Sequence, residues 1–329
     1  MVVGRNAAGK TNLVESMVLL STGRSHRSSA DAELVRWGDD FARVSASVVA
    51  TDRSEELEVI IHARGAANGA RKRIRVNGVN RRASALRPLL RTVLFAPEDM
   101  LLIVGSPSLR RNLLDTLVAQ REATASAVLS TYARTLTQRN SLLRRIREAD
   151  ASRDELNYWD AAICENGGRV LEWRHEAIDA LAEPLEAAHG EIAPDEAPLA
   201  LRYVSNTERQ PGESHEDALR RRLRETADKE VWNGATLVGP HRDDLIFESA
   251  GRELSLFASR GQQRTAILAL KLAELDLLTQ LDRRAPLLLL DDVFSELDPE
   301  RRAHLVRRIG SLPQAIVTTT TADDLDAAL

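Results

Sequence analysis

The sequence predicts an α/β fold in which a lobe of strands and helices is interrupted by a mainly helical insertion. Three observations predict it. A glycine- and lysine-containing loop at residues 4–11 stands between a strand stub and an amphipathic helix. Residues 286–292 form an apolar run ending in two aspartates, as expected of a strand buried in a parallel sheet. Between about 108 and 231 the hydrophobic pattern is that of long helices.

Composition limits the classes of protein. The 329 residues are enough for one large domain or two moderate ones, and 43% hydrophobic residues favour a packed core over disorder. Because the net charge is −4, binding to nucleic acid would need a local basic patch. Cys164 has no partner for an internal disulfide, and no apolar run is long enough for a membrane span or a signal peptide. We therefore expect a soluble, cytoplasmic protein.

The first part of the chain carries clear local signals. Met1-Val2-Val3 reads as a strand stub, and the helix after the loop is expected to end at Gly23. From residue 41 to about 80 the pattern is that of strands, with a hairpin turn at Asn77-Gly78. A short apolar strand follows and ends at Pro97.

The remainder predicts long helices up to about Lys229, with one strand candidate at 199–204. The later elements, in order, are expected to be strands at 235–240 and 244–249, a helix at about 262–280, a strand at 286–292, a helix at 299–309 and a strand at 314–320. The predicted domains are therefore 1–107 and 232–329, which form one α/β lobe, and the inserted helical lobe 108–231.

Residues 4–11 fit the phosphate-binding pattern G-x-x-x-x-G-K-[ST], the P-loop. In such a loop the backbone N–H groups turn inward around phosphates, the lysine reaches the terminal phosphates and the following helix presents its positive end. Ala7 and Ala8 stand where a glycine often eases backbone strain. The residues expected to bind ATP are Gly4, Arg5, Asn6, Ala7, Ala8, Gly9, Lys10, Thr11 and Asn12.

The two aspartates after the apolar run complete this site. Carboxylates at the end of a buried parallel strand lie where such sheets bind ligands. Asp291 is expected to hold Mg²⁺, directly or through water, together with the hydroxyl of Thr11. Asp292 is expected to orient or deprotonate the attacking water, and Asp292 and Lys10 are the predicted catalytic residues.

A second motif indicates which kind of P-loop protein this is. The stretch Ser259, Arg260, Gly261, Gln262, Gln263 opens a long helix and resembles the signature motif of ABC ATPases. It forms a second anion site, although the chain has only one P-loop. ABC proteins solve this in trans, with two heads enclosing two ATP molecules. A D-loop-like segment follows the acidic strand: Ser295, Glu296, Leu297 and Asp298. We therefore expect an ABC-type P-loop ATPase head.

Five segments, taken in order, resemble the RecF family of bacterial recombination-mediator ATPases. They are GRNAAGKTNLVES, VLFAPEDMLLIVGSPSLRRNLLD, TLVGPHRDDL, SRGQQRTAILALKLAE and LLLLDDVFSELDPERR. The resemblance implies a weak ATPase that dimerises on ATP, binds DNA and acts with RecO and RecR to direct RecA onto gapped DNA. Glu98 and Asp99 take the Q-loop position, where they could sense Mg²⁺ or water. The segment 239–244 has two interpretations: its residues could have a functional role, or they could form an ion-paired turn with a structural role only.

Two departures from the ABC pattern accompany the resemblance. Thr318, Thr319 and Thr320 stand near the position of the usual switch histidine, so we expect γ-phosphate sensing to be weak or different. Such heads also begin with two antiparallel strands and a full core strand, of which only the stub 1–3 is present. We expect a misplaced start or a truncation, which would remove part of the adenine site and leave a sheet edge unpaired.

DNA contact is expected from the hairpin carrying Arg71, Lys72, Arg73, Arg75, Arg81 and Arg82. Alternation would place Arg71, Arg73 and Arg75 on one strand face, whereas other arginine runs, such as 220–224, are typical of a solvated surface. Few aromatic residues argue for backbone contact to a duplex, or to a duplex/single-strand junction, over base stacking. The alternatives are another ABC-type ATPase subunit, a P-loop small-molecule kinase, which leaves 259–263 unexplained, and a non-hydrolysing binding module.

Overall fold

The computed structural model describes residues 1–28, 30–50, 53–63, 72–294 and 297–320. Its contacts divide the chain into two units. The first comprises Met1–Asp99 with Ile267–Leu329, and the second comprises Met100–Ala266. Among the described residues, no helix combines the length and the apolar character that crossing a membrane requires.

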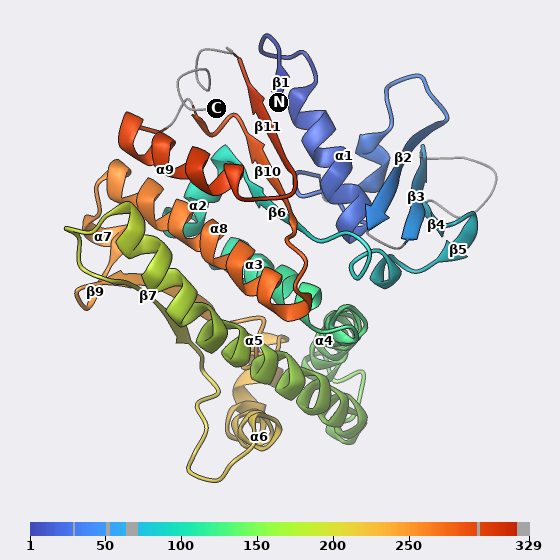
Figure 1. Ribbon diagram of the computed structural model, residues 1–329. Coiled ribbons are helices and arrows are strands. Elements are labelled where there is room, and N and C mark those ends of the chain that lie inside the picture. Colours follow the sequence, from blue (N-terminus) through green and yellow to red (C-terminus); the bar gives the residue numbers. More distant parts are fainter. Residues whose placement is uncertain (29, 51–52, 64–71, 295–296, 321–329) are drawn as a thin grey trace. The chain divides into compact units, whose positions relative to one another are not determined.

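The first unit contains a parallel sheet that brings residues 2–3 beside residues 315–319 (Figure 1). Its strands, in spatial order, are β1 (Val2–Val3), β11 (Ala315–Thr319), β10 (Leu287–Asp291) and β6 (Thr92–Phe95). The helices of this sheet region are α1 (Lys10–Thr22), α8 (Arg260–Asp282) and α9 (Pro299–Gly310), of which α8 begins in the second unit. Val14 and Val18 of α1 pack on Leu289 of β10. The apolar run therefore forms a buried parallel strand, as predicted.

An antiparallel sheet forms the rest of the first unit. Its strands are β2 (Phe41–Ala50), β3 (Arg53–His62), β4 (Lys72–Val76) and β5 (Val79–Arg81), in that order, with the short helices η1 (Asp31–Leu34), η2 (Ala83–Ala85) and η3 (Pro97–Met100). Leu57, Val59 and Ile61 face a core shared with Leu19 and Leu20 of α1. Asn77 and Gly78 both have positive φ angles, 51° and 76°, as the predicted hairpin turn requires.

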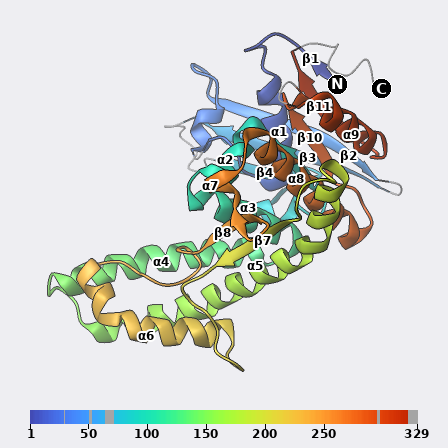
Figure 2. The same cartoon turned by 90° about the vertical axis from the view of Figure 1, so that its left-hand side faces the viewer.

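The second unit is mainly helical. Its helices are α2 (Leu101–Val104), α3 (Pro107–Arg121), α4 (Ala125–Arg147), η4 (Arg153–Glu155), α5 (Leu156–Ile192), α6 (His215–Asn233) and α7 (Leu254–Phe257). An antiparallel sheet joins β7 (Leu199–Val204), β8 (Asp244–Ser249) and β9 (Arg252–Glu253). The long helices α4, α5 and α6 pack against one another (Figure 2).

A pair of glycines explains how closely α6 approaches α5. A Cβ atom at Gly167 would lie 2.7 Å from Cδ2 of Leu219, and one at Gly168 would lie 2.8 Å from Cα of Glu216. At Gly168 the close atom belongs to the backbone, so this position excludes any side chain, whereas at Gly167 the side chain of Leu219 would have to move. The cost of two glycines inside a helix is therefore offset by a tighter helix contact.

The structure corrects one predicted strand. Residues 235–240 are irregular, and the N–H groups of Thr236, Leu237 and Gly239 are bound by side chains instead of a neighbouring strand. The N–H of Thr236 donates to Oδ1 of Asn140 at 2.7 Å, and that of Leu237 donates to Oε1 of Glu230 at 2.7 Å. Residues 232–266, expected in the α/β lobe, lie in the second unit, where β8 pairs with β7.

Candidate nucleotide site

The loop between β1 and α1 has the backbone of an anion cradle. Ala7 and Gly9 both have positive φ angles, 65° and 92°, and the loop leads directly into the first turn of α1, which holds Thr11 and Asn12. Nζ of Lys10 donates to the carbonyl oxygens of Gly4 at 2.7 Å and Arg5 at 3.2 Å. A phosphate is a stronger acceptor than a neutral carbonyl, so it would compete for this ammonium.

The two aspartates lie at the same edge of the sheet as this loop. The N–H of Gly4 donates to the carbonyl of Thr319 in β11 at 3.2 Å, and Asp291 of β10 lies level with Thr318 of β11. Because β1 and β10 flank β11, they are about 10 Å apart, twice the spacing of neighbouring strands. This is the carboxyl edge of the parallel strands, where α/β proteins bind their ligands.

A buried threonine holds both aspartates. Oγ1 of Thr318 donates to Oδ1 of Asp291 at 2.7 Å and accepts from the N–H of Asp292 at 3.1 Å. Asp292 has a positive φ of 54°, a backbone conformation that its N–H contacts to Thr318 help to fix. In the sequence, Thr318 was notable only because it stands near the position that the switch histidine usually takes in ABC ATPases. The relationship to Asp291 depends on the strand register, which no local signal reveals.

The turn after β6 brings Glu98 and Asp99 to the same edge, since Phe95 of β6 pairs with Leu290 of β10. The two carboxylates have different environments. Oδ2 of Asp99 accepts from the N–H of Ala96 at 2.8 Å, and its Oδ1 forms an ion pair with buried Lys271 at 3.2 Å. Glu98 is exposed. Of the two, Asp99 anchors the turn and Glu98 faces solvent.

A second connection at α1 was not foreseen from the sequence. Glu15, one turn after Thr11, accepts a hydrogen bond from Ser25 and lies 3.8 Å from Arg27. His26 stands between Ser25 and Arg27 in the chain. Desolvation lowers the pKa of His26, and the carboxylates of Glu15, Glu98 and Asp291 oppose that shift. The loop that holds His26 therefore lies within electrostatic reach of the aspartate edge.

The signature-like turn is a helix cap in this structure. The hydroxyl of Ser259 accepts from the N–H of Gln262 at 3.3 Å, and Oε1 of Gln262 accepts from the N–H of Ser259 at 3.0 Å. This reciprocal pair is a capping box. Nε2 of Gln263 adds a bond to the carbonyl of Ala258 at 3.1 Å. The N–H groups of Arg260 and Gly261 lie in the first turn, which a helix leaves without internal partners.

The D-loop-like segment is described in part, because Ser295 and Glu296 lie outside the described residues. Leu297 is buried. Asp298 caps α9: its Oδ1 accepts from the N–H of Arg301 at 3.0 Å, and its carboxylate pairs with the guanidinium of the same arginine.

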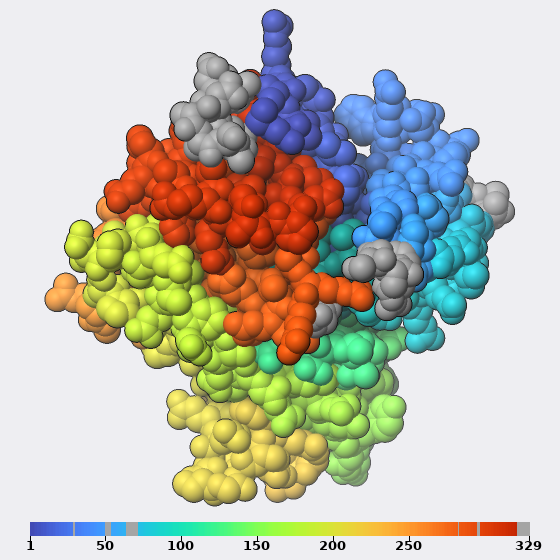
Figure 3. Space-filling view, viewed as in Figure 1, coloured from blue at the N-terminus to red at the C-terminus, as the bar shows by residue number. Residues whose placement is uncertain are grey.

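The basic hairpin is divided between two faces, and Arg71 lies outside the described residues. Lys72 faces the core side, where Nζ donates to the carbonyl of Gly23 at 2.9 Å and pairs with Asp31 at 2.8 Å. Arg73 and Arg75 share the opposite face, where Arg75 pairs with Glu58 at 3.2 Å. Arg81 lines a shallow hollow of about 480 Å³ with Leu89 and others, and Arg82 precedes η2. This segment lies at the surface, cyan in Figure 3.

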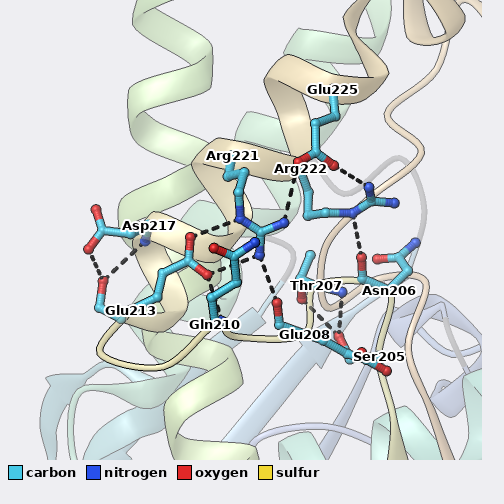
Figure 4. Close-up of polar contacts among 11 residues, drawn as sticks. Ser205, Asn206, Thr207, Glu208, Gln210, Glu213, Asp217, Arg221, Arg222 and Glu225 are labelled. Carbon is cyan, nitrogen blue, oxygen red and sulfur yellow. Dashed lines mark hydrogen bonds and ion pairs between the residues drawn. The ribbon is translucent and has the colours of Figure 1, made fainter.

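The arginine run of α6 is occupied by internal contacts (Figure 4). Arg221 binds Glu213 at 2.9 Å and the carbonyl of Glu208 at 2.9 Å. Arg222 donates to the carbonyl of Asn206 at 3.0 Å and pairs with Glu225. These guanidinium groups tie α6 to the loop before it, and so they are poor candidates for phosphate contact.

The segment 239–244 is a partly buried turn that leads into β8 and is held by ion pairs and hydrogen bonds. Asp243 accepts from the hydroxyls of Tyr203 at 2.8 Å and Ser205 at 2.9 Å, and Asp244 binds Arg110 through two hydrogen bonds of 2.7 and 2.8 Å. Nε2 of His241 lies 3.2 Å from the carbonyl of Thr236. A carbonyl only accepts, so Nε2 carries the proton and Nδ1 accepts from the hydroxyl of Tyr132 at 2.7 Å. These contacts favour the structural reading of the motif.

Comparisons with known proteins extend over nearly the whole chain. The family model described as "RecF/RecN/SMC N terminal domain" matches residues 1–328. The chain is 39% identical over 322 residues to the DNA replication and repair protein RecF of Heliobacterium modesticaldum, covering 97% of this chain and 85% of the relative. It is 36% identical to the RecF of Bacillus subtilis, covering 99% and 88%.

Solved structures agree with this fold. The structure of the recombination mediator protein RecF with ATP, in the RecFOR pathway, matches with a TM-score of 0.89 at 32% identity, covering 98% of this chain and 86% of that chain. The Smc head domain from Pyrococcus furiosus matches with a TM-score of 0.50 at 17% identity, covering 99% and 84%, and supports the fold alone. The predicted ABC-type head fold with α/β and helical parts is confirmed. The chain belongs to the RecF family.

Proposed function

We propose that this chain is an ATP-dependent DNA-binding protein of recombinational repair that dimerises on ATP and hydrolyses it slowly. One observation carries the ATP part of the proposal. The P-loop and the tandem aspartates lie at one edge of one parallel sheet, joined through Thr319 and Thr318 of β11. A relative with 32% identity has been solved with ATP, which supports the same ligand here.

The donor set at this edge fits a hard divalent cation. The hydroxyl of Thr11 and the carboxylate of Asp291 are oxygen ligands of the kind that Mg²⁺ prefers, and Asp291 is already oriented by Thr318. Bound Mg²⁺ would neutralise charge on the phosphates. Lys10 would exchange its contacts with Gly4 and Arg5 for phosphate oxygens, and Asp292 would orient the attacking water.

The signature-like turn supports a homodimer. The turn at Ser259, Gly261 and Gln262 opens a helix of 23 residues, so its N–H groups and helix dipole suit an anion. A phosphate there would displace the side chain of Gln262 from the capping box. The chain has a single P-loop, so that phosphate would belong to the ATP of a second copy.

DNA is the proposed macromolecular ligand, with Arg73 and Arg75 as the contacting pair on the outer face of the hairpin. Partnership with RecR, RecO and RecA is proposed from family membership. The small-molecule kinase, an alternative from the sequence, would be a monomer with or without ATP, and this separates it from the proposal.

Light scattering tests the proposal. We expect Asp292→Asn to bind ATP and Mg²⁺, to change from monomer to dimer and then to retain a short duplex. Lys10→Ala is the matched control and should stay monomeric because it loses nucleotide binding. A protein that binds ATP and stays monomeric under every condition would contradict the dimer and favour the kinase reading. Dimerisation without retention of DNA would contradict the DNA-binding part alone.

A further inference from the structure

Two aromatic rings lie side by side on the outer face of the antiparallel sheet, whose strands are labelled β2, β3 and β4 in Figure 1. Ala42 of β2 and Ile61 of β3 belong to the core, so their neighbours Phe41 and His62 point to the other face. The two residues are opposite each other across the strands, and their ring centroids are 6.2 Å apart. Phe41 is 54% exposed, so one of these rings is largely open to solvent.

Packing alone does not account for the aromatic residues at this end of the sheet. Nε2 of His62 is shielded from water and has no hydrogen-bond partner among the described residues, which costs free energy. Trp37, four residues before Phe41, is 98% exposed in the turn that the N–H of Asp39 closes onto the carbonyl of Arg36 at 3.0 Å. An exposed ring gains little from folding, because the hydrophobic contribution depends on the area removed from water.

Arginines follow the two rings on the same face. The next row across the sheet is Arg43, Ile60 and Arg73, and the row after it contains Glu58 and Arg75. Successive rows are two residues apart along a strand, about 7 Å. Glu58 pairs with Arg43 at 2.5 Å and with Arg75 at 3.2 Å, whereas Arg73 forms no ion pair with another described residue. Three guanidinium groups therefore share one carboxylate, and these rows are basic.

Exposed rings beside arginines suit the two parts of a single nucleic-acid strand. Guanidinium groups bind phosphates, and aromatic rings stack on bases whose faces are free. Bases inside a duplex already stack on each other, so only unpaired bases can use such rings. Asp39 and Asp40 are exposed in the turn that holds Trp37, and their carboxylates repel phosphates. The end of the sheet at Phe41 therefore favours bases, and the arginine rows favour the backbone.

We propose that the outer face of β2, β3 and β4 is a platform for unpaired bases, which stack at Phe41 and His62 while the phosphates of the same strand lie on Arg43 and Arg73. This inference rests on the proposed DNA binding and deepens it. A duplex on Arg73 and Arg75 would continue as a single strand over the rings, so the ligand would be a duplex/single-strand junction. Aromatic residues are scarce in the chain as a whole, but two of them meet at this one place.

The test measures fluorescence anisotropy with ATP and Mg²⁺ on a blunt duplex and on the same duplex with a single-stranded tail. The parent should bind the tailed duplex more tightly. Phe41→Leu keeps an apolar side chain and loses the ring, so its affinity for the tailed duplex should fall at least about fivefold, with little change on the blunt duplex. Phe41→Tyr keeps the ring and is the matched control, which should behave like the parent.

A fluorescent base analogue, 2-aminopurine, placed in the tail reports stacking directly, because stacking quenches its emission. The parent and Phe41→Tyr should quench it, and Phe41→Leu should not. Unchanged tail preference in Phe41→Leu would overturn the platform, and so would equal losses on both DNAs. A parent that binds both DNAs equally would refute the platform and leave the proposed DNA binding in place. A parent that binds neither DNA would refute the DNA binding itself.

Discussion

The hydroxyl of Thr318 lies 2.7 Å from Oδ1 of Asp291 and is fully buried between β11 and the end of β10. The same oxygen accepts from the N–H of Asp292 at 3.1 Å. One side chain therefore orients the predicted Mg²⁺ ligand and the backbone of the residue predicted to orient water. The sequence identified the two aspartates as site residues, and the structure adds Thr318 as the residue that holds both of them.

Thr318→Val tests this relationship, because valine keeps the shape and removes both side-chain bonds. A hydrogen bond to a charged group contributes about 1.5–3 kcal/mol, so we expect ATP turnover to fall by about tenfold or more. ATP affinity measured without Mg²⁺ should change little. Thr318→Ser keeps the hydroxyl and should retain most of the turnover. Equal turnover in the serine and valine variants would show that the bond to Asp291 has no functional role.

The positive φ of Ala7 in the P-loop leads to a second prediction, which concerns stability. Ala7 has a φ of 65°, a left-handed conformation that costs a non-glycine residue about 1 kcal/mol. Ala7→Gly should remove that strain and raise the free energy of unfolding by up to about 1 kcal/mol, less the greater freedom of glycine in the unfolded chain. Ala8 is not among the residues with positive φ, so Ala8→Gly should be neutral or destabilising. Chemical denaturation of both variants measures the difference, and equal effects would contradict the strain.

Acid should weaken the second unit through His241. Burial lowers the pKa of this imidazole to about 4, and the nearby Arg242, Arg111 and Arg139 act in the same direction. Between pH 6.5 and about 4 the unfolded chain binds a proton that the folded chain resists, so stability falls as the pH decreases through this range. The contribution is up to about 3 kcal/mol.

The measurement is the free energy of unfolding at pH 7 and pH 4.5, for the parent and for His241→Gln. The variant lacks the titrating group, so its stability should fall less over this range even if it is less stable at pH 7. Parallel losses in both proteins would mean that His241 does not contribute to the acid sensitivity. His175 and His215 also have pKa values lowered mainly by burial, so a part of the slope should persist in the variant.

The two faces of the hairpin lead us to expect that neighbouring basic residues contribute differently to DNA binding. Arg73 lies on the outer face of β4, whereas Lys72 is held by Asp31 and Gly23 on the core side. Arg73→Ala should weaken binding to duplex DNA of any sequence and lower the salt dependence by about one phosphate contact. Arg222→Ala, which alters an arginine bound to Asn206 and Glu225, is the control and should leave the salt dependence unchanged. A titration of DNA affinity against salt concentration measures both, and equal slopes for Arg73→Ala and the parent would exclude Arg73 as a phosphate contact.

Local patterns were sufficient for the fold class and for naming the main residues of the candidate site, whose roles stay predictions. The P-loop, the apolar strand at 287–291 and the hairpin turn at Asn77-Gly78 depend on residues close together in the chain, and each was predicted. Their physics is local: glycine permits positive φ, the lysine follows the loop at a set spacing, and an apolar run of strand length requires burial on both faces. The assignment of site residues at 259–263 and 295–298 to roles in trans stays a prediction.

Tertiary structure decided which distant residues meet. Thr318 lies beside Asp291 and Lys271 beside Asp99 only because of strand register and helix packing. The segment 235–240 has strand-like composition, but Asn140 and Glu230 bind the N–H groups that a neighbouring strand would have paired. Lys72 and Arg73 are adjacent in sequence and lie on opposite faces of one strand. The sequence alone determined the residues capable of this chemistry, whereas long-range packing determined their partners, because a polar group enters a core only where a complementary group is already in place.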